Sequence, residues 1–152
     1  MKLILGKSKW EMWDDPLEVF LKRVNASGFD ATEIYLGSLP ESPAEIARLH
    51  TAYGLRLIGQ ILTQGETHLD HIRSLESQFE FAAQCQVVFI NSHAGRDIFD
   101  FAENVQIFRR AIQLSQSSGI PFLVETHRGR PTYSAIETRK YLETIPELRL
   151  TA

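Results

Sequence analysis

The sequence predicts an α/β fold in which parallel strands alternate with outer helices. Short apolar or β-branched runs, typical of buried strands, are separated by longer stretches whose apolar residues follow helical spacing. Strict alternation of strand and helix indicates a parallel sheet covered by helices. The predicted strands are 2–5, 31–36, 55–62, 87–91, 120–125 and 148–151.

The stretches between these strands carry the expected helix signals. Leu17, Phe20, Leu21 and Val24 fall on one helical face, and the same spacing recurs in 69–79 and 101–112. Each predicted start has a capping residue with a Glu three positions later, and a glycine follows several predicted ends. The starts are Asp15, Ser42 and Ser134, and the glycines are Gly28, Gly54 and Gly119.

Two architectures fit this alternation: a doubly wound open sheet and a closed barrel. Neither a GxGxxG nor a GxxxxGK[ST] loop follows the first strand, which favours the barrel. No linker divides the chain, so we expect a single domain over 1–152. An eight-unit barrel takes about 250 residues. The sequence therefore predicts an incomplete (β/α) barrel, truncated after about six of its eight units.

An incomplete barrel leaves strand edges open, and open edges invite pairing with another chain. We therefore expect a homo-oligomer that associates through the sheet edges. Three explanations stay open: a fragment of a longer enzyme, a natural truncation, or a protomer whose missing wall comes from a partner.

Composition narrows the class of protein. The formal net charge is −3 with no run of like charges, which argues against a nucleic-acid partner. No apolar run approaches a membrane span, and we expect no membrane partner. Cys85 is the single cysteine, which excludes an intrachain disulfide and fits a reducing cytoplasm, the expected location. We interpret Cys85 as a half-buried structural residue rather than a nucleophile.

One internal repeat singles out two strand ends. The segments INSHAGR (90–96) and VETHRGR (124–130) share the pattern [IV]-[NE]-[ST]-H-x-G-R at the same place in successive units. Side chains alternate across a strand, so Asn91 and His93 share one face, and Glu125 and His127 share the matching face next door. If that face is the barrel interior, the four groups converge at the C-terminal mouth, where barrel enzymes act.

These groups have a chemical and a structural interpretation. A carboxylate and imidazoles can bind a divalent metal or act as general acid and base. Arg96, Arg128 and Arg130 can clamp a phosphate or carboxylate. Alternatively, the strand ends are ordinary structural polar residues and the arginines are solvated loop charges.

Other polar residues are weaker candidates. Glu33 lies near a strand end and is expected to face inward, with a solvent-facing or helix-contacting role as the alternative, and Gln60 is similarly placed. His68 and His71 have a spacing that can bind metal, but exposed helix histidines are commoner.

The segments SGFDATEIYL, FINSHAGRDIF and FLVETHRGRPTYS, in this order and spacing, resemble the xylose-isomerase-like superfamily of TIM barrels. The second and third are similar to a bacterial branch of sugar phosphate isomerases and epimerases. The resemblance covers essentially the whole chain. It implies a sugar or sugar-phosphate substrate and a divalent metal (Mn, Mg, Zn or Co) at the C-terminal mouth, with absence of the metal from a truncated chain as the alternative.

Carried over by position, the resemblance assigns Glu125 as a metal ligand and acid/base carboxylate. The family's other ligands come from an Asp of strand six, a His of strand seven and a Glu of strand eight. The Asp is expected just beyond Ala152, and the last two strands are absent. The residues expected to bind substrate are His93, His127, Arg128, Arg130, Asn91 and Glu33.

Two functions follow as hypotheses. The first is a divalent-metal-dependent sugar or sugar-phosphate isomerase or epimerase, which transfers a proton next to a carbonyl. The alternative is a non-catalytic truncated barrel that binds a sugar phosphate or a partner chain. DNA repair, as in the endonuclease branch of the superfamily, is disfavoured by the net charge.

Overall fold

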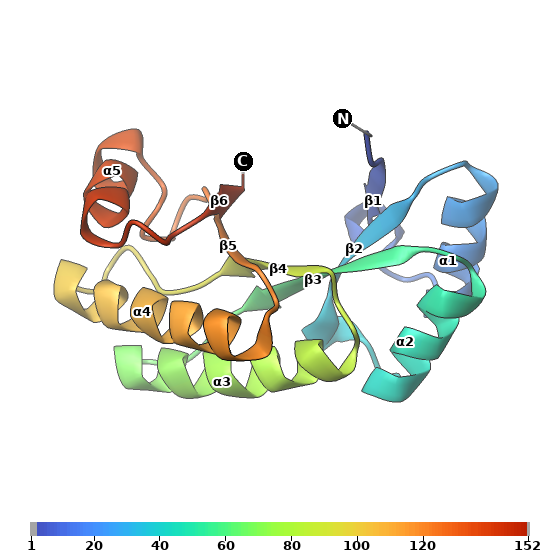
Figure 1. The fold of residues 1–152 in the computed structure, drawn as a ribbon, viewed down its shortest axis with the longest axis horizontal. Helices are drawn as coiled ribbons and strands as arrows, with labels where there is room; N and C mark the ends of the chain where they lie inside the picture. Colours follow the sequence, from blue (N-terminus) through green and yellow to red (C-terminus); the bar gives the residue numbers. More distant parts are fainter. Residues whose placement is uncertain (1–2, 152) are drawn as a thin grey trace.

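A computed structural model of the protein describes residues 3–151, which form a curved, all-parallel sheet. The six strands lie side by side in chain order, and β1 and β6 rise at the two ends of the sheet (Figure 1). The sheet is therefore an incomplete TIM barrel, as predicted. The strands are β1 (Gly6–Ser8), β2 (Ala31–Tyr35), β3 (Arg56–Leu62), β4 (Phe89–His93), β5 (Phe122–Glu125) and β6 (Leu150–Thr151).

Helices follow the strands and cover the outer side of the sheet (Figure 1). The two longest, α3 and α4, lie side by side beneath the middle strands. None of the helices in residues 3–151 combines the length and apolar character that a membrane crossing requires. The α-helices are α1 (Leu17–Ala26), α2 (Pro43–Ala52), α3 (His68–Gln84), α4 (Phe101–Ser118) and α5 (Ala135–Thr144), with short 3-10 turns η1 (Trp10–Met12) and η2 (Leu36–Ser38).

The first strand lies later than the sequence predicted. We expected it at 2–5, of which residue 2 lies outside the described part of the chain, but the residues that pair with β2 are Gly6–Ser8. Leu3, Ile4 and Leu5 have large exposed fractions of 73%, 38% and 50%. Their apolar character suggested a strand, but the three residues that follow them are the ones that pair with β2 (Ala31–Tyr35).

Helix capping is confirmed at two of the three predicted starts. The hydroxyls of Ser42 and Ser134 each accept the backbone N–H three residues on, although the Glu side chains at those positions pair with nearby basic residues instead. The predicted cap Asp15 is wrong, because Pro16 occupies the N-cap and Asp15 pairs with Arg23. All three predicted terminal glycines adopt the left-handed conformation.

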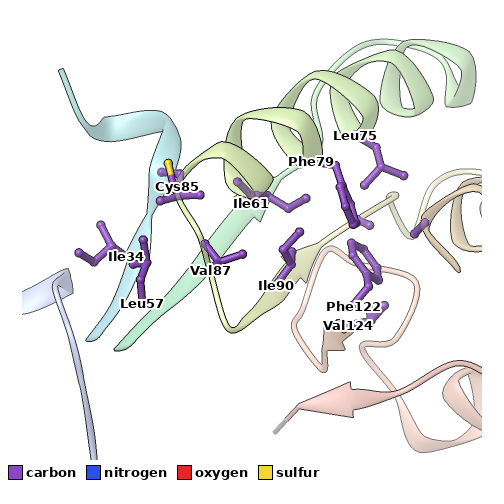
Figure 2. Packing of buried hydrophobic residues seen from close by; sticks show 14 of the residues in the cluster. Ile34, Leu57, Ile61, Leu75, Phe79, Cys85, Val87, Ile90, Phe122 and Val124 are labelled. Carbon is purple, nitrogen blue, oxygen red and sulfur yellow. The ribbon is translucent and has the colours of Figure 1, made fainter. Parts of the chain in front are cut away.

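The hydrophobic core lies between the sheet and the helices. Figure 2 shows Ile90 and Phe122 of the sheet against Leu75 and Phe79 of α3, and the rings of Phe79 and Phe122 stack at 6.4 Å. Burial of such side chains is the main stabilising term in folding. Cys85 belongs to this core with 1% exposure, so it is fully rather than half buried. Burial raises the pKa of its thiol to about 11, which supports the structural interpretation.

Strand register determines what the opposite, concave face carries. Gln60 of β3 is the register partner of Asn91, Leu62 is the partner of His93, and Glu125 of β5 is the partner of Thr151. Paired residues of neighbouring strands project to the same side. The outward positions are filled by core residues such as Ile90 and Val124, so the intervening Asn91, His93 and Glu125 project from the concave face. We call the space that this concave face encloses the trough.

His50 is a buried histidine held in its neutral form. Its Nδ1 lies 2.8 Å from the Ile46 carbonyl, so it donates there, and its Nε2 lies 2.9 Å from the Thr32 hydroxyl, from which it accepts. Burial lowers the pKa of His50 below its ordinary value of 6.5, and the Ile46 hydrogen bond only partly opposes that shift. Protonation therefore favours the unfolded chain.

Acid is accordingly expected to weaken the fold through His50. The lowered pKa of the folded state means that this contribution is complete above pH 6.5 and is lost as the pH falls below that value. The free energy of unfolding in urea should be lower at pH 5.5 than at pH 7.5, and a His50→Gln variant should lose less over this interval. An equal loss in the variant would contradict the assignment.

Candidate functional site

Four of the predicted site residues meet at the C-terminal end of the trough. Glu33 comes from β2, Asn91 and His93 from β4, and Glu125 from the end of β5. The structure therefore brings together side chains separated by up to 92 positions, because the carboxyl ends of parallel strands share one edge.

Asn91 is the centre of this cluster. Its Nδ2 donates to Glu33 Oε1 at 2.6 Å and to Glu125 Oε2 at 2.8 Å, so one amide group joins two carboxylates. The Nε2 atom of His93 lies 2.9 Å from the same Oε2 of Glu125. That contact requires a proton on His93 Nε2, which we assign from the geometry.

Two further residues complete the cluster. Gln60 Nε2 lies 3.4 Å from Glu125 Oε2, and Thr151 donates its hydroxyl proton to Asn91 Oδ1 at 2.5 Å. Gln60 Oε1 is buried and has no hydrogen-bond partner within residues 3–151. The sequence marked Gln60 only as a polar residue near a strand end, and nothing in it singled out Thr151. Strand register was the signal needed, since Gln60 pairs with Asn91 and Thr151 with Glu125.

The cluster keeps Glu125 ionised. Burial acts to raise the pKa of the Glu125 carboxyl, but hydrogen bonds from His93, Asn91 and Gln60 and the charge of His93 outweigh it, so the pKa lies below its ordinary value. At neutral pH, Glu125 is a carboxylate. Its side chain remains 26% exposed, which leaves it accessible to a ligand in the trough.

A hollow of about 240 Å³ lies beside these groups. Ile58 and Phe89 supply apolar wall, and Glu33, Asn91, Glu125 and Thr151 supply polar wall. Polar groups that converge beside apolar wall residues are typical of sites that hold and orient a small molecule.

The other predicted site residues lie next to this cluster, outside its hydrogen bonds. β5 ends at Glu125, so His127 stands in the following loop, where its ring centroid lies 4.7 Å from that of His93. We expected His127 to share the inward strand face with Glu125; instead it is exposed and reaches the site through His93. Arg128 and Arg130 line a separate hollow together with Arg96.

No cluster of metal-ligating side chains is found among the described residues. Within 3–151, no three His, Cys, Asp or Glu side chains gather closely enough to hold an ion. His93 Nε2 contacts Glu125 rather than standing free as a ligand. His68 pairs with Glu103 while His71 contacts Thr63, so these histidines do not share a site. Glu125 is the one predicted metal ligand, and an ion there would need further ligands.

Comparison with solved structures shows the fold. The chain is similar to the IolI protein with a binding zinc atom (TM-score 0.77, 11% identity, covering 97% of this chain and 62% of that one). It is also similar to a xylose isomerase domain containing protein from Salmonella typhimurium (0.74, 15%, 94% and 59%). A third is a sugar phosphate isomerase/epimerase from Parabacteroides distasonis (0.71, 12%, 96% and 63%).

The fold is therefore the one shared by these xylose isomerase-like TIM barrel structures, as expected from the sequence, and at 11–15% identity the likeness shows the fold alone. This chain spans about three-fifths of the length of those structures. No protein-family model and no curated protein sequence matches it.

The Asn91 bridge generates a prediction about stability. In an Asn91→Asp variant, a third carboxylate replaces the amide that donates to Glu33 and Glu125, so two hydrogen bonds become repulsions. We expect a loss of about 1–3 kcal/mol in the free energy of unfolding at pH 7.5. Asn25→Asp, the same change at an exposed position of α1, is the control. Equal stability of the two variants in urea would show that the bridge contributes nothing.

Proposed function

We propose that this chain provides the Glu125 side of the active site of a sugar or sugar-phosphate isomerase or epimerase. The observation that carries the proposal is the ionised Glu125, held by His93 and Asn91 at the C-terminal mouth of a parallel sheet. The fold supports it, since solved structures of the same fold include a sugar phosphate isomerase/epimerase. Because a fold alone does not assign a reaction, the proposal depends on the side chains of the site.

Glu125 is the proposed proton carrier. An ionised, partly exposed carboxylate can remove a proton from the carbon next to a carbonyl. His93 Nε2–H and the Asn91 amide both bond Oε2, which leaves Oε1 as the oxygen directed to substrate. The two donors hold the carboxylate in one orientation, and such positioning contributes much of a catalysed proton transfer.

Glu33 is the proposed second carboxylate. Epimerisation needs a proton donor on the face of the carbon opposite the one from which the proton is taken. Glu33 would deliver that proton in its protonated form, so that one turnover leaves Glu125 protonated and Glu33 ionised, and exchange with solvent restores both. Glu33 lies across Asn91 from Glu125, with both carboxylates bonded to the same amide nitrogen. It comes from β2, three strands away from β5, so the two carboxylates approach the hollow from different sides.

In this proposal, Glu125 is the only residue among 3–151 that would bind a divalent metal ion. A bound ion would polarise the substrate carbonyl as a Lewis acid. Residues 3–151 do not bring a group of three such ligands together, and the proton transfers proposed for Glu125 and Glu33 do not use a metal ion.

The incomplete ligand set favours a second candidate function. A barrel with the same cluster but no metal would bind a sugar phosphate, or a partner chain along its edges, without turning a substrate over.

Replacement of Glu125 tests the enzymatic proposal. A Glu125→Gln variant should lose solvent deuterium exchange into a panel of ketoses, aldoses and their phosphates by about 10²–10⁴-fold, the usual contribution of a general base. The exchange is measured by NMR of the sugars after incubation with the protein in D2O. Glu147→Gln, at an exposed position before β6, is the matched control and should retain it. Exchange unchanged by Glu125→Gln would refute the role.

Metal titration separates the two candidate functions. If the natural-length protein is the enzyme, Mn²⁺ or Zn²⁺ should bind at 1:1 stoichiometry in calorimetry, and Glu125→Gln should weaken binding at least tenfold, equivalent to about 1.4 kcal/mol. Absence of binding in the unaltered protein would favour the non-catalytic barrel.

A further inference from the structure

A second hollow of about 440 Å³ adjoins the Glu125 cluster and has a different chemistry. The loops that follow β3, β4 and β5 form it, so it lies at the same mouth of the sheet. We call it the arginine hollow. Its lining residues are Thr63, Gln64, Gly65, His71, Arg96, His127, Arg128, Gly129 and Arg130.

Three guanidinium groups line the arginine hollow without a balancing carboxylate. Within residues 3–151, Arg96, Arg128 and Arg130 form no ion pair. The lining itself contains no acidic residue, although Asp97 lies close enough to act on Arg130 electrostatically. Most surface arginines elsewhere in the chain, such as Arg48, Arg73 and Arg139, are paired. The hollow is therefore a concentrated positive site.

Two of the arginines are held in place by the fold. Arg130 is half-buried and donates from Nη1 to the Gly95 carbonyl at 2.8 Å, which leaves its other N–H groups available. The Arg96 backbone is bonded in both directions by the buried Asn104 side chain, at 3.3 and 2.9 Å. Burial lowers the pKa of Arg130 and the charge of Arg96 lowers it further, so the two like charges lie near each other.

A buried imidazole without a full set of partners also lines this hollow. His71 is 1% exposed, and its Nε2 makes no hydrogen bond of good geometry among the described residues, although the Gly65 backbone lies close enough to raise the His71 pKa against the effect of burial. Its Nδ1 lies 2.7 Å from Thr63 Oγ1, which accepts the Gly95 N–H at 3.0 Å. The Thr63 proton therefore points to the close His71 Nδ1 rather than to the His93 carbonyl at 3.4 Å. This assignment makes Nε2 an N–H donor.

An unpaired cluster of donors in a hollow matches an oxyanion, because guanidinium groups bind phosphate and carboxylate through paired hydrogen bonds. The hollow also lies next to the proton-transfer site. His127 lines it, and the His127 ring packs against His93, which bonds Glu125. A substrate with its reacting carbon at Glu125 would have to pass the two imidazoles to reach this hollow.

We propose that the arginine hollow is an anion subsite in which Arg96 and Arg130 bind the phosphate or carboxylate group of a sugar substrate. The proposal rests on the function proposed for Glu125 for the identity of the sugar, but not for anion binding itself. It makes the substrate an acidic sugar derivative, either a sugar phosphate or a sugar acid, and gives Arg96 and Arg130 the role of binding and orienting it.

Calorimetric titration of the natural-length protein with inorganic phosphate and with gluconate tests the subsite. Low ionic strength is used because salt screens exposed charges. Arg96→Gln and Arg130→Gln should each weaken binding about tenfold or more, the range expected for one charged hydrogen-bonding group. Arg56→Gln is the matched control, an exposed and unpaired arginine among residues 3–151, at the opposite end of β3. Arg96 is exposed, so its replacement should leave the fold intact even if that of Arg130 does not.

The outcomes separate this proposal from the preceding one. Arginine-dependent binding of phosphate supports the subsite with a sugar phosphate, and arginine-dependent binding of gluconate supports it with a sugar acid. Glu125→Gln should still bind inorganic phosphate, because Glu125 lies outside the hollow. If neither anion binds, or if Arg96→Gln binds as tightly as Arg56→Gln, the subsite is overturned. Loss of deuterium exchange in Glu125→Gln with no anion binding would leave the proton-transfer role standing.

Discussion

The two faces of the curved parallel sheet meet different surroundings, and the rest of the molecule depends on this difference. Residues such as Ile90, Phe122 and Val124 point outward into the helical layer and form the core. The residues that alternate with them along each strand point inward, where they do not pack against the helices. Polar groups can therefore occupy the inner face at the strand ends without disturbing the hydrophobic layer that holds the fold together.

Asn91 holds the polar groups of the inner face in a fixed arrangement. The Asn91 amide donates to both Glu33 and Glu125, and the Thr151 hydroxyl bonds the amide oxygen. The result is a pair of carboxylates held at fixed positions, of which Glu125 has a lowered pKa.

The loops beyond the strands add charge of the opposite sign. Gly95 adopts a left-handed conformation, and its carbonyl receives the Arg130 side chain while its N–H is bonded by Thr63. One loop position thus connects the arginine hollow to the end of β3. Negative charge lies in the trough and positive charge in the adjoining loops, an arrangement suited to a ligand with a reacting carbon at one end and an anionic group at the other.

The sequence by itself determined the strand and helix alternation, five of the six strand positions and the expectation that Asn91, His93 and Glu125 share the inward face, because these follow from local periodicity and a repeated motif. Its alternation also indicated that Glu33 could face inward. Only the tertiary structure decided that β1 starts at Gly6, that Gln60 and Thr151 join the cluster, and that His71 lies beside the arginines. Those contacts depend on the register between strands and on loop conformation. Both are set by long-range packing, and no local pattern of residues encodes them.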